Sequence, residues 1–319
     1  MYLNCHTWFS LRYGTFSAEA LCQLAKKKGI TSVAVTDINN TSACLEFLKI
    51  APSYGIKPLV GIDFRNDHQA LYVGIAKNRH GFLRLNRYLS EHLHQKKAFS
   101  VIAPELEDCF FIYPFEQALQ LPATAFQPQR LIGVGMYDLN RFKFSKFNAE
   151  EYQQHLVFLS SVTVRHQKDF NAHRLLRAID LNTLLSKLPK TQQADKAHRM
   201  YAQEEVEEHF RDYPFILENT HQLIEGCRVD FEFGKGLNQN LKVYTRSQQE
   251  DEALLRKLCD ERLEKRYPHP SAYVHQRLTK ELDAIIRLGF VSYFLINLDI
   301  VEYARSKDYP FIGRGSGAN

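Results

Sequence analysis

Apolar positions in the first third of the chain follow two alternating patterns. Short apolar runs typical of strands occur at residues 2–9, 31–37 and 57–64. Segments with helical spacing of apolar residues lie between them, at 15–30 and 41–56. Strands that alternate with helices through short connections pair in parallel, with right-handed crossovers. The pattern therefore predicts an α/β fold whose strand ends open at one mouth.

A second domain is expected near the C-terminus, because the composition changes there. Residues 228–244 are polar and contain glycine, and a strand is predicted on either side of them. Three helices follow, and residues 310–312 are predicted to form a strand. We expect one domain over residues 1–232 and a second over residues 233–319.

Composition is that of a soluble globular protein and says little about partners. Hydrophobic residues make up 45% of the chain and charged residues 24%. No apolar run approaches the ~20 residues that span a bilayer, and no signal peptide is evident, so we expect a cytoplasmic protein with no membrane partner. The six cysteines are expected to be reduced. A net charge of +5 permits a polyanionic partner without demanding one.

Polar side chains stand at the ends of the first three predicted strands. They are His6, Asp37 and Asp63. At the mouth of a parallel barrel, one imidazole and two carboxylates suit Zn²⁺, Mn²⁺ or Fe, which would activate water or hold a phosphate oxygen. Aspartate after a strand is also a common helix cap or turn residue, and a lone histidine often only satisfies a hydrogen bond. The pattern leaves both interpretations open.

The sequence ends in a glycine-rich loop formed by Gly313, Arg314, Gly315 and Ser316. Glycines allow backbone N–H groups to approach an anion, Ser316 offers a hydroxyl, and Arg314 supplies positive charge. The loop is predicted to bind a nucleotide di- or triphosphate, with a flexible turn as the alternative. It lacks the lysine of the GxxxxGK[ST] loop. Because the sequence stops inside the motif, we expect a fragment of a longer protein.

These motifs resemble the N-terminal part of the alpha subunit of bacterial DNA polymerase III, the replicative family C polymerase. Three segments resemble the first motifs of its polymerase-and-histidinol-phosphatase (PHP) domain: CHTWFSLRYGTF (5–16), GITSVAVTDINN (29–40) and YGIKPLVGIDF (54–64). Residues 278–319 resemble the start of the palm, up to its nucleotide-binding glycine-serine motif. The resemblance implies a distorted parallel (βα) PHP barrel followed by an α+β palm fragment.

The resemblance also implies a reaction and partners for the full-length protein. Such a polymerase uses two Mg²⁺ ions to add dNTPs to the primer of a DNA primer-template, and it works with a proofreading exonuclease subunit, a sliding clamp and a clamp loader. In this family the catalytic aspartates lie beyond the glycine-serine motif. We therefore expect this chain alone not to polymerise DNA, and to bind DNA weakly and with strong salt dependence.

Compared with active PHP domains, the barrel mouth is depleted of ligands. Four positions have lost a ligand-type side chain: Asn4, Ile38, Ser161 and Thr163. A trinuclear centre needs several anionic and imidazole ligands to offset the desolvation of its ions, and His6, Asp37 and Asp63 are too few. We expect the PHP metal, Zn²⁺ or Mn²⁺, to be absent or partial, and these three residues to be hydrogen-bonded to one another or to water.

Three hypotheses for the barrel remain open. In the first, it is structural, supporting the palm and docking the exonuclease subunit. In the second, it is an active metal-dependent phosphoesterase or 3′–5′ proofreading exonuclease. In the third, the chain is an interaction module with no retained chemistry.

Overall fold

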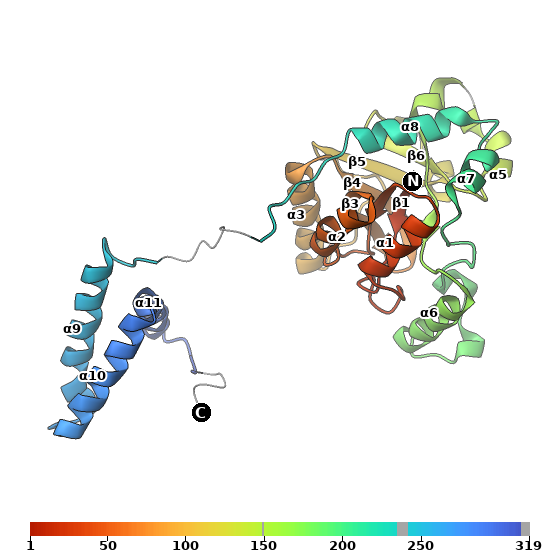
Figure 1. The fold of residues 1–319 in the computed structure, drawn as a ribbon. Helices are drawn as coiled ribbons and strands as arrows, with labels where there is room; N and C mark the ends of the chain where they lie inside the picture. Colours follow the sequence, from red (N-terminus) through yellow and green to blue (C-terminus); the bar gives the residue numbers. More distant parts are fainter. Residues whose placement is uncertain (149, 235–241, 314–319) are drawn as a thin grey trace. The chain divides into compact units, whose positions relative to one another are not determined.

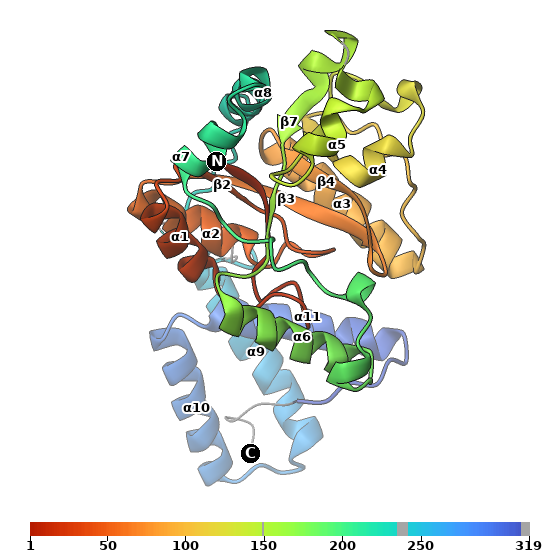
Figure 2. The same ribbon diagram turned by 90° about the vertical axis from the view of Figure 1, so that its right-hand side faces the viewer.

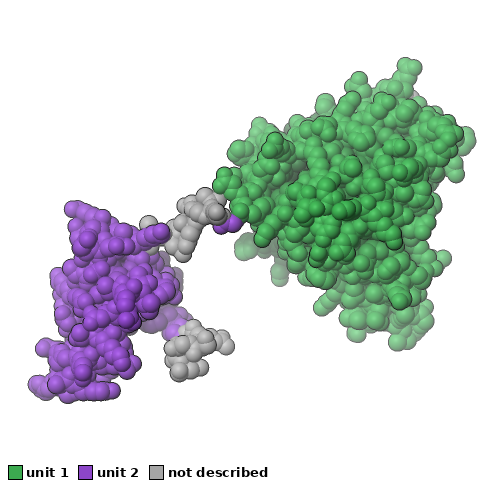
Figure 3. Space-filling view, viewed as in Figure 1, with its two compact units in different colours: residues 1–233 green, residues 234–319 purple. Residues whose placement is uncertain are grey.

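The computed structural model describes residues 1–148, 150–234 and 242–313. The chain divides into two compact units, residues 1–233 and residues 234–319 (Figure 3).

The first unit is built on one curled sheet (Figure 1). In the order β7-β6-β5-β4-β3-β2-β1-β8, its strands are Leu156–Phe158, Arg130–Val134, Cys109–Pro114, Gln69–Ala76, Lys57–Asn66, Ser32–Val35, Tyr2–Cys5 and Ser161–Val162. All neighbours pair in parallel except at β4, which is antiparallel to both β3 and β5. The central strands are buried on both faces, as expected for strands covered by helices.

The curl of the sheet follows from its chain connections. β7 and β8 are the two edge strands, yet only Leu159 and Ser160 separate them in sequence. Three residue steps span at most about 11 Å, so the two edges must lie close together. The sheet therefore wraps round into a distorted barrel, which confirms the predicted α/β barrel class.

Helices cover the outside of this barrel. They are α1 (Ala18–Lys27), α2 (Cys44–Ile50), α3 (Arg79–Gln95), α4 (Phe115–Leu119), α5 (Leu139–Lys143), α6 (Gln167–Asp180), α7 (Gln203–His209) and α8 (Pro214–Glu225), joined by short 3₁₀ turns. Figure 2 shows α1 and α2 side by side, and α8 beside β7. Ser17 caps α1 by accepting from the N–H of Ala20, and Gly29, with φ of 69°, lets the chain turn away after it.

In its described residues, the second unit contains helices only. They are α9 (Gln248–Arg266), α10 (Ala272–Arg287) and α11 (Val291–Ser306), packed around Leu255, Leu282, Val291 and Leu295. The strand expected at residues 310–312 is not formed, so the α+β description of this fragment is wrong for the part that the structure describes. A strand needs a paired neighbour, and Ile312 is 85% exposed without one there.

No single helix in the described ranges is long and apolar enough to cross a membrane. α10 and α11 pass that test only as a pair, which is bent by 111° at its break.

Gly61 offers a test of the barrel's strand packing. A Cβ atom on Gly61 of β3 would lie 2.1 Å from the carbonyl oxygen of Gly74 on β4. We expect Gly61→Ala to lower the free energy of unfolding by about 1–3 kcal/mol, because backbone atoms must shift to admit the methyl group. Gly226→Ala is the matched control, since its Cβ would meet nothing closer than 3.5 Å. Equal urea midpoints for the two variants would contradict this packing.

Candidate functional site at the barrel mouth

The centre of the mouth holds a buried ion pair between Asp63 and Arg65 of β3. Alternate residues on a strand face the same side, which brings these two side chains together. The Nε and Nη2 atoms of Arg65 lie 3.1 and 2.6 Å from Asp63 Oδ2, and the side chains are only 9% and 2% exposed. Burial would raise the pKa of Asp63, but Arg65 and His6 outweigh it and hold that pKa well below its usual range.

His6 follows β1 and is fully buried beside this pair. Its Nε2 donates to Asp63 Oδ2 at 2.9 Å, and its Nδ1 lies 2.9 Å from the hydroxyl oxygen of Thr163. Both ring nitrogens therefore have protein partners. The expected contact between His6 and Asp63 is present in the structure.

Asp37 takes one of the two roles that the sequence left open, that of a turn residue. Its Oδ1 accepts from the backbone N–H of Thr7 at 2.6 Å and from the N–H and hydroxyl of Ser10, and its Oδ2 accepts from the hydroxyl of Thr7 at 2.7 Å. These bonds fix the loop after β1, so Asp37 is a turn anchor. The expectation that Asp37 bonds to His6 or Asp63 is wrong, because the polar loop groups already occupy both of its oxygens.

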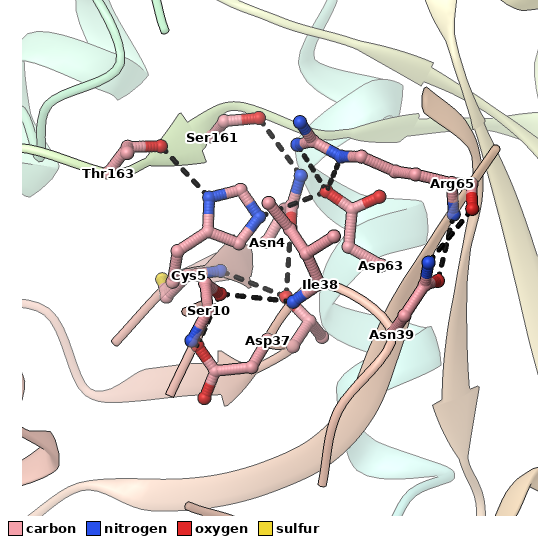
Figure 4. Close-up of polar contacts among 12 residues, drawn as sticks. Asn4, Cys5, Ser10, Asp37, Ile38, Asn39, Asp63, Arg65, Ser161 and Thr163 are labelled. Atoms are coloured by element: carbon pink, nitrogen blue, oxygen red, sulfur yellow. Dashed lines mark hydrogen bonds and ion pairs between the residues drawn. The ribbon is translucent and has the colours of Figure 1, made fainter. Parts of the chain in front are cut away.

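The four positions without ligand-type side chains form neutral contacts around the mouth (Figure 4). Asn4 donates to the hydroxyl of Ser161 at 2.9 Å and accepts from the hydroxyl of Thr36 at 2.8 Å. Ile38 donates its backbone N–H to Ser10 Oγ, and Thr163 contacts His6. This shell consists of amide and hydroxyl groups, which are weak ligands for transition metals, and of the Ile38 side chain, which cannot coordinate one.

A cleft of about 840 Å³ opens above these residues and includes groups from α6. The guanidinium groups of Arg65 and Arg177 lie 5.0 and 5.7 Å from the ring centre of Tyr13. His173 donates from Nδ1 to the carbonyl of Tyr13 and accepts at Nε2 from the N–H of Ala194. Burial lowers the pKa of His173 to about 4, which keeps this imidazole neutral at pH 7.

The residues at the mouth do not fit a PHP metal centre. His6 and Asp37 have no nitrogen or carboxylate oxygen left without a partner, and Asp63 Oδ1 is the single carboxylate oxygen at the mouth that is buried without one. The guanidinium of Arg65 already balances the charge of Asp63. The described residues include no group of three or more His, Cys, Asp or Glu side chains arranged to hold a metal.

The second predicted site falls largely outside the described residues. Arg314, Gly315 and Ser316 lie beyond the described ranges, and Gly313 is the last described residue before them. Their proposed contact with nucleotide phosphates is therefore not tested by the structure.

Comparisons with known proteins show two matched domain families and similar full-length relatives. The PHP domain family matches residues 3–121, and the bacterial DNA polymerase III alpha NTPase domain family matches residues 253–319. DNA polymerase III alpha subunits from Halalkalibacterium halodurans, Vibrio cholerae and Bacillus subtilis are 26%, 25% and 26% identical to the chain, and each match covers 100% of it and 31% of the relative. Over its whole length, the chain is therefore similar to bacterial DNA polymerase III alpha subunits.

The chain therefore spans about a third of the length of these DNA polymerase III alpha relatives. Among solved structures, a putative metal-dependent phosphoesterase from Bifidobacterium adolescentis matches 66% of this chain and 94% of its own, with 12% identity and a TM-score of 0.28.

Residues that the sequence patterns did not single out complete the mouth. Arg65 supplies its cation, Tyr13 its aromatic wall, and Thr7 and Ser10 the donors that hold Asp37. The position of Arg65, two residues after Asp63 on a predicted strand, was an available signal, because that spacing places both on one face.

The ion pair predicts a distinctive pattern of stability changes. Arg65→Met should lower the free energy of unfolding by about 3–5 kcal/mol, because it leaves Asp63 buried without its cation. The double variant Asp63→Asn/Arg65→Met should lose less free energy of unfolding than Arg65→Met alone, because it leaves no unpaired buried charge. Urea unfolding measures all three proteins.

An exposed pair of the same spacing provides the control. Arg228 contacts Asp230 at 2.7 Å, and these side chains are 83% and 68% exposed. Arg228→Met should change stability little, since surface ion pairs are screened by water. An Arg65→Met variant as stable as Arg228→Met would contradict the account.

Proposed function

We propose that this chain is the N-terminal portion of a DNA-directed DNA polymerase that adds dNTPs to the primer of a primer-template during replication. The observation that carries the proposal is the alignment of the whole chain with polymerase III alpha subunits. The order of the two matched domains along the chain supports it. Residues 1–232 would then be the PHP domain, and residues 233–319 the beginning of the palm.

In this proposal, residues of the second unit help to bind the incoming nucleotide. Gly313, Arg314, Gly315 and Ser316 would hold its phosphates through backbone N–H groups, a hydroxyl and a guanidinium. Two Mg²⁺ ions would neutralise developing charge on the transferred phosphoryl group, held by residues outside this chain. The 319 residues by themselves would not extend a primer.

We further propose a structural role for the barrel, as a rigid platform for the polymerase and a docking surface for the proofreading exonuclease subunit. The buried network of His6, Asp63 and Arg65 supports this role, because it joins β1 to β3 through charges that already satisfy one another. A sliding clamp and a clamp loader would be further partners of the cytoplasmic polymerase. No observation at the mouth favours an active phosphoesterase or exonuclease.

Primer extension tests the polymerase proposal. The polypeptide encoded by the complete reading frame that contains these residues should extend a primed template with Mg²⁺ and four dNTPs, and the 319-residue chain should not. The result is read as elongated primer on a sequencing gel. A reading frame that ends at Asn319, or a complete polypeptide that cannot extend the primer, would contradict it.

A further inference from the structure

A second cleft lies beside the barrel mouth, with a lining of cations and aromatic rings. It has a volume of about 770 Å³. Its walls come from the segment after β8, the start of α6, residues 195–201 and Tyr137. His198 lines both this cleft and the one at the mouth. The proposed polymerase chemistry uses none of these residues.

Two cations of this cleft are not neutralised by the protein. Lys196 and Arg199 are exposed, and neither forms an ion pair with a carboxylate in the part of the chain that the structure describes. They lie instead over aromatic rings, with Lys196 Nζ 5.3 Å from the ring centre of Phe170 and Arg199 Cζ 4.9 Å from that of Tyr201. These contacts orient both cations and leave their charges available to an anion.

A third cation and two carboxylates complete the charges of the cleft. Arg165 lines it but is neutralised by Asp169, with Nε 2.6 Å from Oδ2 and Nη2 3.0 Å from Oδ1. Asp195 is the one carboxylate in the lining, and its Oδ1 accepts from the N–H of Ala197. Positive charge therefore predominates.

The segment that carries the two free cations is held in place by the barrel. The carbonyl of His198 accepts from the backbone N–H groups of Thr163 and Val164, at 2.8 and 3.1 Å. The N–H of Tyr201 donates to the hydroxyl of Tyr2 at 2.7 Å. Before Lys196, the N–H of Ala194 donates to His173 Nε2 at 2.8 Å. Because the backbone is anchored on both sides of Lys196 and Arg199, the two cations are presented from a fixed segment.

His198 also lines the cleft. Its Nδ1 is buried and has no hydrogen-bond partner among the described residues. Burial lowers the pKa of His198 to about 4, so the ring is neutral at pH 7 and can donate or accept one hydrogen bond.

We propose that this cleft binds a nucleotide unit through its phosphate and its base. Lys196 and Arg199 contact the phosphate, and the ring of Tyr137, a side chain 66% exposed at the rim, stacks on the base. Every base has a π face and every nucleotide a phosphate, so this lining recognises nucleotides without reading sequence. The nucleotide is either free or part of a single strand.

Fluorescence anisotropy with a labelled oligothymidylate tests this assignment on the complete 319-residue chain. Lys196→Gln/Arg199→Gln should weaken binding at least fivefold and make the slope of log K against log salt less negative by about 1.4, the value for two lost phosphate contacts on a single strand. Lys26→Gln/Lys27→Gln removes the same charge from exposed positions in the last turn of α1 and should stay within twofold of the wild type. Equal losses in the two double variants, or no loss in either, would overturn the site.

Substitutions of Tyr137 test the stacking contact. Tyr137→Leu should weaken binding about fivefold or more, the loss of one stacked base, while Tyr137→Phe keeps the ring and should bind within twofold of the wild type. Equal binding by these two variants would overturn the base contact.

Thymidine monophosphate as a competitor separates the two sources of the nucleotide. Displacement of the oligonucleotide at equal nucleotide concentration indicates a site for free nucleotides, and displacement only in large excess indicates a strand. If the same concentration of thymidine monophosphate displaces the oligonucleotide from the wild type and from Lys196→Gln/Arg199→Gln, neither kind of nucleotide binds at this cleft, and the proposal is overturned. Binding is measured without polymerisation, so its failure would leave the polymerase proposal standing.

Discussion

Asp63 and Arg65 form an ion pair that is almost fully removed from water at the centre of the barrel mouth. Two charges in such a place are tolerated only when each satisfies the other, and His6 adds a third partner to the same carboxylate oxygen. This arrangement constrains the rest of the mouth. A cation supplied by the protein stands beside the carboxylate, so a divalent ion at Asp63 would meet electrostatic repulsion from Arg65.

The other mouth residues are consistent with this internal balance of charge. Both carboxylate oxygens of Asp37 accept hydrogen bonds from the loop after β1, including those from the backbone N–H groups of Thr7 and Ser10. Asn4 links a hydroxyl on β8 to the hydroxyl of Thr36 without adding charge. The polar contacts at the mouth therefore hold β1, β3 and β8 together. They are the basis for the proposal that the barrel is a rigid structural platform.

Some of this was predictable from sequence and some was not. The apolar run before His6 places this residue directly after β1, and the parallel topology of β1, β2 and β3 brings it beside Asp63. Asp63 was expected to end its strand, but it lies inside β3, which continues to Asn66. The partner of Asp37 was not predictable, because it depends on how the loop after β1 folds. The strand expected at residues 310–312 is absent for a related reason. An apolar run indicates that a segment will be buried, but the segment becomes a strand only where a neighbouring strand pairs with it.

Metal content tests the account of the mouth most directly. The chain is loaded with excess Mn²⁺ or Zn²⁺, passed through a desalting column and analysed for metal per chain, with His6→Ala as the comparison. The balance of charge between Arg65 and Asp63 predicts much less than one equivalent, equal in the two proteins. One or more equivalents in the wild type, lost in His6→Ala, would show a working metal site and contradict the account.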